Sequence, residues 1–304
     1  MNKYSTPSWV FDMFKHTYLC VIFCLFSCNS LAENVNAAPI EIRLPKISDN
    51  DVRYHYPSDL LKFLLDKTGK DYRLTTTESF YSQARAVESL KANRIQIYWM
   101  GTSAKAEKEL RAVRYPIYRG LMGFRVFIIN KEHQARFRTI FNLSDLQRLT
   151  GVQGIGWSDV AILEASKLHQ QEHHYETAFQ LIQAKRVDYF SRSIHEAFLE
   201  VDSRIDKYPD ISVDDQLLLT YPFAMFFFTG KDNSGLADLL QEGFEISYQD
   251  GSFVEFFYTH PVIKGVIEKS NLQSRVRIDI PNHTLSKESK SIPQRFWHTI
   301  ERLK

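Results

Sequence analysis

Short apolar runs and amphipathic stretches alternate along most of the chain, starting near Pro39. Runs rich in aromatic and β-branched residues, or alternating apolar with polar ones, predict strands at 40–44, 72–77, 95–101, 124–130 and 223–230. Apolar residues three or four positions apart predict helices at 58–69, 82–93, 143–149, within 151–168, and at 233–260 with a break near Asp250. This alternation is typical of an α/β fold with mainly parallel strands.

The pattern restarts after Pro116, and the stretch 175–193 again predicts a helix followed by a strand. The chain therefore contains two α/β units. With 304 residues, of which 44% are hydrophobic, it can bury a core in two domains of ordinary size. Ser58 or Asp59 is expected to cap the helix at 58–69.

The N-terminal segment has the pattern of a secretory signal peptide. A basic flank at Lys15 precedes a short apolar run that holds all three cysteines, and small residues follow as far as Ala32. Residues 1–32 are therefore predicted to be removed on export, which leaves a mature chain without disulfides. Two alternatives stay open: a buried N-terminal helix, and a lipoprotein anchored at Cys28, because 25–28 resembles a lipobox.

The charge and the motifs exclude several classes of function. A net charge of +2, from 38 basic and 36 acidic side chains, gives no broad field that would attract nucleic acid. The sequence has no G-x-S-x-G, no H-E-x-x-H and no Walker loop, so no cofactor is expected. His169 and His173 could hold zinc on one face of a helix, but no further ligands lie near them, and a solvated helix end is the preferred interpretation.

The glycine-rich segment 151–156 resembles a dinucleotide-binding loop. Its spacing is G-x-x-G-x-G, however, and no acidic residue ends a following strand where such a loop requires one, so we interpret it as a tight turn before a helix. The turn places Trp157, Ser158 and Asp159 at the start of that helix, where free N–H groups favour an anionic ligand group. The alternative is that Ser158 or Asp159 only caps the helix.

Three arginines lie at transitions between predicted elements, within two residues of Gly or Ser: Arg119, Arg125 and Arg192. Each one alone is explained by structure, but together they suggest a site that holds a carboxylate by paired hydrogen bonds. Few acidic residues lie near them in sequence, so they are expected to lack local partners. Tyr54 and Trp99 follow the first strand or end the third, where open α/β sheets bind ligands; core packing is the alternative for Trp99.

The order of these pieces resembles the bacterial periplasmic solute-binding proteins of family 3, the polar amino acid type, over residues 39–275. The resemblance is carried by IEIRL, ESLKANRIQIYWMGT, RYPIYRGLMGFRVFIIN, NLSDLQRLTGVQGIGW, AFQLIQAKRVDYF and LADLLQEGFEISYQDGSFVEFF. Each pattern is weak by itself, and it is their shared order that makes the resemblance specific.

The resemblance implies an α/β, two-lobed periplasmic-binding-protein-like (type II) fold with a discontinuous first lobe and a two-strand hinge. Residues 39–118 and 223–304 would form the first lobe, and residues 119–222 the second. The chain would cross between the lobes after Pro116 and return near Pro222, and closure of the lobes would desolvate a ligand. Arg119 and Arg125 would then lie near the floor of the cleft.

The sequence departs from this family at the two places that hold an amino acid, the one for its α-carboxylate and the one for its α-amino group. Family members carry an arginine three residues after the threonine that ends the third strand, and here the count from Thr102 falls on Lys105. They also place an aspartate soon after a strand of the second lobe, where this chain has Arg192 and, a turn later, Glu196. These changes argue against an ordinary α-amino acid and favour an anionic solute, although Glu196 or Asp159 could still hold an amine.

The resemblance thus implies a monomeric, non-enzymatic periplasmic protein that binds a small anionic or amino-acid-like solute for an ABC importer or a membrane-bound sensor. The residues expected to contact the solute are Tyr54, Trp99, Thr102, Lys105, Arg119, Arg125, Trp157, Ser158, Asp159 and Arg192. Two other functions stay open. One is a lyase of the cyclohexadienyl dehydratase type with Glu196 as its acid, and the other is an interaction protein whose cleft binds nothing.

Overall fold

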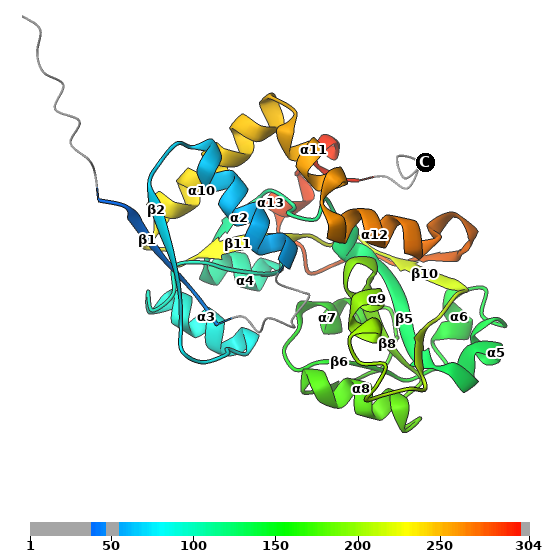
Figure 1. Cartoon of the computed structure of the whole chain (residues 1–304). Helices are drawn as coiled ribbons and strands as arrows, with labels where there is room; N and C mark the ends of the chain where they lie inside the picture. The colour runs from blue at the N-terminus through cyan, green and yellow to red at the C-terminus, as the bar shows by residue number, and fades with distance from the viewer. Residues whose placement is uncertain (1–37, 47–54, 299–304) are drawn as a thin grey trace, which may run out of the picture. The chain divides into compact units, whose positions relative to one another are not determined.

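Figure 1 shows a computed structural model of the chain, which describes residues 38–46 and 55–298. The predicted signal segment 1–32, with Cys28, and the predicted contact residue Tyr54 lie outside these described residues. Within the described part, no helix is both long enough and apolar enough to cross a membrane.

The N-terminal part of the described chain is a βαβ unit. Strand β1 (Ile40–Leu44) pairs in parallel with β2 (Tyr72–Thr76), and helix α2 (His55–Lys67) lies between them in sequence. Helix α3 (Gln83–Lys91) follows β2 and is capped by the hydroxyl of Ser82, which accepts a hydrogen bond from a backbone N–H in the first turn.

A small antiparallel sheet continues this part. Strand β11 (Met225–Thr229) lies between β3 (Tyr98–Gly101) and β4 (Arg111–Val113), although β11 comes from far along the chain. Helix α4 (Ala104–Glu109) connects β3 to β4, and helix α10 (Ser234–Gln249) packs against β4, β11 and α2 (Figure 1).

A second, larger sheet is built from later strands: β5 (Phe124–Asn130), β6 (Gly151–Gly154), β7 (Gln170–His173), β8 (Tyr189–Ser193), β9 (Ile211–Val213), β10 (Leu217–Thr220) and β12 (Val276–Asp279). The order is β12-β10-β5-β8-β6-β7, with β9 also paired to β5. The helices of this part are α5 (Gln134–Phe137), α6 (Leu143–Leu146), α7 (Ser158–Ala165), α8 (Tyr175–Gln183) and α9 (Ile194–Asp202).

Strand β5 is apolar along almost its whole length because both of its faces are covered. Val126 and Ile128 belong to one core cluster, while Phe127 and Ile129 belong to another on the opposite face. A strand buried on both faces loses the alternation of apolar and polar residues that marks a half-exposed strand. This packing makes β5 a rigid support for the residues at its start.

Two short segments connect the smaller sheet to the larger one, and a third, longer passage, residues 230–275, leads from β11 to β12. Residues 114–123 lead from β4 to β5, and residues 221–224 return from β10 to β11. They touch directly, since the backbone N–H of Tyr221 donates to the carbonyl of Gly123 at 3.1 Å. A Cβ on Gly123 would lie 1.9 Å from that Tyr221 carbonyl oxygen, and Gly120 has φ +87°, so both positions require glycine.

The C-terminal part packs back onto these connections. Helices α11 (Ser252–Thr259), α12 (Pro261–Ser270) and α13 (Lys287–Lys290) follow α10, and α12 packs against α9. The backbone N–H of His298 donates to the carbonyl of Arg119 at 2.6 Å, so the end of the described chain covers the first connection.

The predicted α/β fold is confirmed, but three details of the prediction are wrong. The larger sheet is mixed, because β5 runs antiparallel to the strands beside it, and the small sheet of β3, β11 and β4 is antiparallel throughout. Helix α2 begins at His55, so neither Ser58 nor Asp59 caps it; Pro57 is tolerated in a first helical turn, and the buried Tyr56 extends the apolar face. The third predicted strand is also shorter, and the sequence interpretation missed several elements: β4, β6, β7, β9, β10, β12, α4, α5, α9, α12 and α13.

Two strands show how the observed sheets compare with the predicted lobes. Residues 225–229 join strands of the N-terminal part, as a discontinuous first lobe requires. Residues 276–279 pair with β10 in the larger sheet, although they fall within the predicted range 223–304. The lobe boundaries stay a prediction.

Candidate functional site

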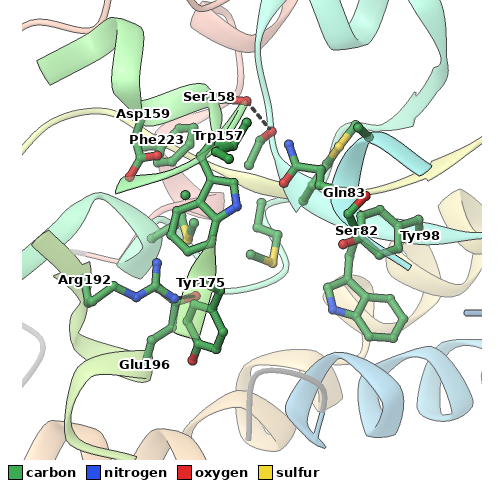
Figure 2. Close-up of a pocket in the computed structure, with 18 of the residues that line it drawn as sticks. Ser82, Gln83, Tyr98, Trp157, Ser158, Asp159, Tyr175, Arg192, Glu196 and Phe223 are labelled. Carbon is green, nitrogen blue, oxygen red and sulfur yellow. Dashed lines mark hydrogen bonds and ion pairs between the residues drawn. The ribbon is translucent and has the colours of Figure 1, made fainter. Parts of the chain in front are cut away.

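A cavity of about 390 Å³ lies among elements of both sheets (Figure 2). On one side its wall comes from the start of α3 and from β3, and on the other from the starts of α7, α8 and α9 and the end of β8. Met122 and Phe223, from the two connecting segments, also line it. Cavities of a few hundred cubic ångströms that join several elements are typical of small-molecule sites.

One hydrogen bond joins the two sides of this cavity. The hydroxyl of Ser158, the first residue of α7, donates to the carbonyl of Gly101 at the end of β3, at 3.2 Å (Figure 2). The glycine-rich segment makes this placement possible, because a Cβ on Gly154 would lie 2.2 Å from the ring of Trp157. The turn interpretation of 151–156 is wrong for 151–154, which form strand β6; the turn is limited to the residues after it, which lead into α7.

Arg125, at the start of β5, is fully buried and does not line the cavity. Its Nη2 donates to Asp159 Oδ2 and to the carbonyl of Ser191, both at 2.8 Å, and its Nη1 donates to the carbonyl of Met122 at 3.2 Å. Burial raises the pKa of Asp159, and the charge of Arg125 opposes that rise. Arg125 therefore holds α7 against the larger sheet.

Arg192, near the end of β8, lies in a buried cluster with two glutamates of α9. Its Nε and Nη2 donate to the two carboxylate oxygens of Glu200, at 2.8 and 2.7 Å, and Nη2 also lies 2.8 Å from Glu196 Oε1. The hydroxyl of Tyr175 donates to Glu200 at 2.6 Å, and the guanidinium lies 4.6 Å from the ring centroid of Trp157. The expectation that the arginines lack local partners is thus wrong for Arg192, whereas the partner of Arg125 lies 34 residues away along the chain.

His195 is a buried histidine in the wall of the same cavity. Its Nδ1 lies 2.5 Å from the hydroxyl oxygen of Ser193, and that hydroxyl donates to the carbonyl of Leu121 at 2.9 Å. Ser193 therefore accepts from His195 Nδ1–H, which leaves Nε2 as an acceptor. Burial lowers the pKa of His195 well below 6.5, and Arg125 and Arg192 lower it further. The ring is thus neutral at neutral pH.

We expect this buried histidine to make stability depend on pH. Below pH 6.5 the unfolded chain binds a proton at His195, whereas the folded chain does so only near its lower pKa. The stability that is present above pH 6.5 should therefore be lost as the pH falls towards the pKa of the folded state. One titrating group contributes up to about 1.4 kcal/mol per pH unit. Urea unfolding at pH 7 and pH 5 should show a smaller pH-dependent loss in His195→Asn than in the natural protein; an equal loss would contradict the assignment.

Aromatic rings make up much of the remaining wall. They come from both sides of the cavity: Tyr81, Tyr98, Trp99, Trp157, Tyr175 and Phe223. Figure 2 shows Trp157 and Tyr175 close to Arg192 and Glu196, with Tyr98 on the opposite side. A solute in this cavity would therefore contact ring faces and a small number of charged groups.

Half of the residues that the sequence predicted to contact the solute line the cavity: Trp99, Trp157, Ser158, Asp159 and Arg192. Tyr54 lies outside the described residues. The other four are placed elsewhere: Thr102, Lys105, Arg119 and Arg125. The two arginines expected at the floor of the cleft are thus absent from the lining.

The surroundings of three of these four residues explain why they do not line the cavity. Thr102 is buried, and its hydroxyl donates to Glu107 at 2.8 Å, while Lys105 is exposed on the helix between β3 and β4. Arg119 is buried against the C-terminal segment, where its Nη2 donates to the carbonyl of Arg295 at 3.2 Å.

The cavity also contains residues that the sequence interpretation did not select, among them Gln83, Met122, Tyr175 and His195. A signal for His195 was present. Ser193 and Glu196 form a capping box, and this S-x-x-E pattern directly after a strand predicts a helix that starts at the carboxyl end of that strand. The residues of its first turn then lie at the sheet edge where ligands bind.

The described residues contain no group of three or more His, Cys, Asp and Glu side chains that could hold a metal ion. The histidines considered for zinc are not on a helix. His173 ends strand β7 and His169 precedes it, so the two lie about 13 Å apart along an extended chain, too far to share an ion. The prediction of a helix end at this place is wrong.

No protein-family model matches the chain, and no curated protein matches it. Solved structures do. An ancestral arginine-binding protein bound to arginine matches with a TM-score of 0.53 at 14% identity, over 72% of this chain and 96% of that one. An ancestral amino acid-binding protein, a precursor of cyclohexadienyl dehydratase, matches at 0.52 and 14%, over 72% and 93%. A periplasmic binding protein of Salmonella typhimurium with high arginine specificity matches at 0.51 and 13%, over 76% and 98%.

These similar structures are amino-acid-binding proteins, and at such low identity the likeness shows the fold. The predicted two-lobed, periplasmic-binding-protein-like fold is confirmed. The predicted resemblance to family 3 is confirmed at the level of the fold, for a sequence that has diverged far from these proteins. The fold by itself carries neither a ligand nor an activity.

Proposed function

We propose that this chain is a non-enzymatic solute-binding protein whose two lobes close around one small organic molecule. The observation that carries the proposal is the cavity, which is lined from both sheets, has aromatic walls and contains a buried cluster of charged side chains. Solved structures with this fold include proteins bound to arginine, glutamine and glutamate, so a solute of amino-acid size fits the fold.

The proposal extends to the setting in which the protein works. The basic flank and apolar run before Ala32 support removal of a signal peptide and residence in the periplasm. There the protein, as a monomer, would pass its solute to an ABC importer or present it to a membrane-bound sensor. The lobes that close would consist of residues 39–118 with 223–304, and of residues 119–222.

We expect a solute released by denaturing the protein from its native host to bind again to the refolded protein and to raise its melting temperature. At a free concentration one hundred times the dissociation constant, ligand binding stabilises a folded protein by about 2.7 kcal/mol. Calorimetric titration measures the affinity, which Trp157→Ala should weaken, because this ring lines the cavity. Phe141→Ala, which removes an exposed ring outside the cavity, is the matched control and should bind as the natural protein does.

Unchanged binding by Trp157→Ala would contradict the cavity as the site. Absence of a released solute and of stabilisation by any small molecule would contradict a solute-binding role. The interaction protein with an empty cleft would then be the better account. Small-angle scattering with and without the solute measures whether the lobes close.

A lyase is the second candidate, and one observation favours it. His195, neutral and with Nε2 as an acceptor, and Glu196 line the same cavity, so two groups that can accept or pass on a proton lie next to each other. Incubating the protein with the released solute and analysing the mixture by mass spectrometry separates the two functions. Unchanged solute supports a binding protein, whereas loss of water or another small fragment supports a lyase.

A further inference from the structure

We propose that the solute is an organic cation without a carboxylate, such as an amine or a guanidine. This inference rests on the proposed function, since it names the class of solute for the same cavity. It differs from the anionic solute that the sequence predicts, and from the amino acids bound by the similar structures. Three features of the cavity lead to it: an occupied guanidinium, carboxylates with unused acceptors, and aromatic walls.

The first feature is that the cavity offers no free guanidinium edge for a carboxylate. Among the described residues that line it, Arg192 is the only arginine or lysine. Nη2 belongs to both edges through which a guanidinium can bind a carboxylate bidentately, and Nη2 already contacts Glu200 and Glu196. A solute carboxylate would have to displace one of these two buried glutamates.

The N-terminus of α9 is also occupied by a side chain of the chain itself. Glu196 Oε2 accepts from the backbone N–H of Ser193, which completes the capping box of α9. Asp159 lies in the first turn of α7 and is bonded to Arg125. The N-terminus of α9, which would otherwise favour an anion, therefore already faces a carboxylate, and Asp159 places a second carboxylate in the first turn of α7.

The second feature is an excess of acceptors over donors. Five charged side chains form the buried cluster, two arginines and three carboxylates, so the cluster carries one net negative charge: Arg125, Arg192, Asp159, Glu196 and Glu200. Glu196 uses two of the roughly four acceptor positions of a carboxylate. His195 adds another acceptor through Nε2. When closure removes water from such a cluster, a cation stabilises it and a further anion does not.

The third feature is the chemistry of the walls. Trp157 already lies against one cation, the guanidinium of Arg192, and Tyr175 lies 5.9 Å from the same group. Rings of this kind attract cations through their faces, most strongly where water is excluded. Tyr98 and Trp99 extend the aromatic wall to the other side of the cavity, where they can contact the carbon skeleton of an amine.

The test uses pairs of molecules that differ in the carboxylate: agmatine with arginine, and tyramine with tyrosine. Argininamide, in which an amide replaces the carboxylate, separates the effect of the carboxylate from the effect of the carbon skeleton. We expect the amine of at least one pair to bind at least tenfold more tightly than its amino acid in calorimetric titration, and argininamide to bind more tightly than arginine. Tighter binding of the amino acids would overturn the inference.

Two substitutions locate the effect at the charged cluster. Glu196→Gln keeps an acceptor for the capping box but removes the charge, so it should weaken binding of the amine at least tenfold. Glu200→Gln leaves Arg192 with one carboxylate partner and should shift the preference towards the amino acid of the pair. Glu132→Gln, at an exposed ion pair outside the cavity, is the control and should change neither. Circular dichroism shows whether each variant is folded.

The solute released from the native host decides the matter if no pair binds. A released amine or guanidine without a carboxylate supports the inference, and a carboxylic acid or an amino acid overturns it while leaving the proposed function intact. Absence of any released or binding small molecule contradicts the proposed function itself, and the inference with it.

Discussion

Replacing Arg125 by methionine should lower the free energy of unfolding by about 3–5 kcal/mol, because the substitution leaves the carboxylate of Asp159 buried without its partner. The carbonyls of Ser191 and Met122 would lose a donor at the same time. Urea unfolding followed by circular dichroism measures the change.

The double variant Arg125→Met with Asp159→Asn should be more stable than Arg125→Met alone, since it removes the unpaired charge as well. An exposed ion pair supplies the control: Arg138, paired with Asp215, is more than half exposed, and Arg138→Met should leave the unfolding midpoint nearly unchanged. A small effect of Arg125→Met, similar to that of the control, would show that the buried pair does not stabilise the fold.

Replacing Gly123 by alanine should destabilise the protein by about 1–3 kcal/mol and disturb the contact between the two connecting segments. The added Cβ would lie 1.9 Å from the carbonyl oxygen of Tyr221, and backbone, unlike the end of a flexible side chain, cannot turn away. Because the same segments are the proposed hinge, this variant should also bind the solute less tightly. Thermal unfolding and calorimetric titration measure the two effects.

Gly265→Ala is the matched control for this substitution. Gly265 lies within α12 with nothing within 4 Å of the added Cβ, so alanine there should stabilise the helix by about 0.5–1 kcal/mol. The two glycine substitutions are thus expected to have opposite signs. Equal effects would contradict the close approach of the connecting segments.

About half of the described strands and helices could be predicted from the sequence, because each of these depends on residues that are close together along the chain. Strands β5 and β11 are continuous apolar runs, and α3 is marked by Ser82 at its cap. Helix α2 begins earlier than predicted, since the burial of Tyr56 depends on its hydrogen bond to the carbonyl of Ile117, which is distant in sequence. The relative direction of paired strands also depends on contacts between distant segments, so the sequence did not predict the antiparallel pairs.

The candidate site was predicted in part. Trp157, Ser158 and Asp159 could be placed at a ligand-facing helix start because a glycine-rich turn precedes them. The pairing of the arginines could not be predicted, because Asp159 lies 34 residues from Arg125 and meets it only when α7 packs against β5. Glu200, eight residues after Arg192, faces it only because α9 turns back at the end of β8.

The sequence by itself determined the α/β class, the order of about half of the described elements and the positions of the arginines, because local spacing of apolar and polar residues controls these features. The tertiary structure alone decided which arginines have partners. Ion pairing depends on distances between segments that are far apart along the chain, and a buried guanidinium attracts whichever carboxylate the fold brings beside it. Whether a solute meets net positive or net negative charge in the cavity therefore depends on how the chain packs, and not on how many arginines the sequence contains.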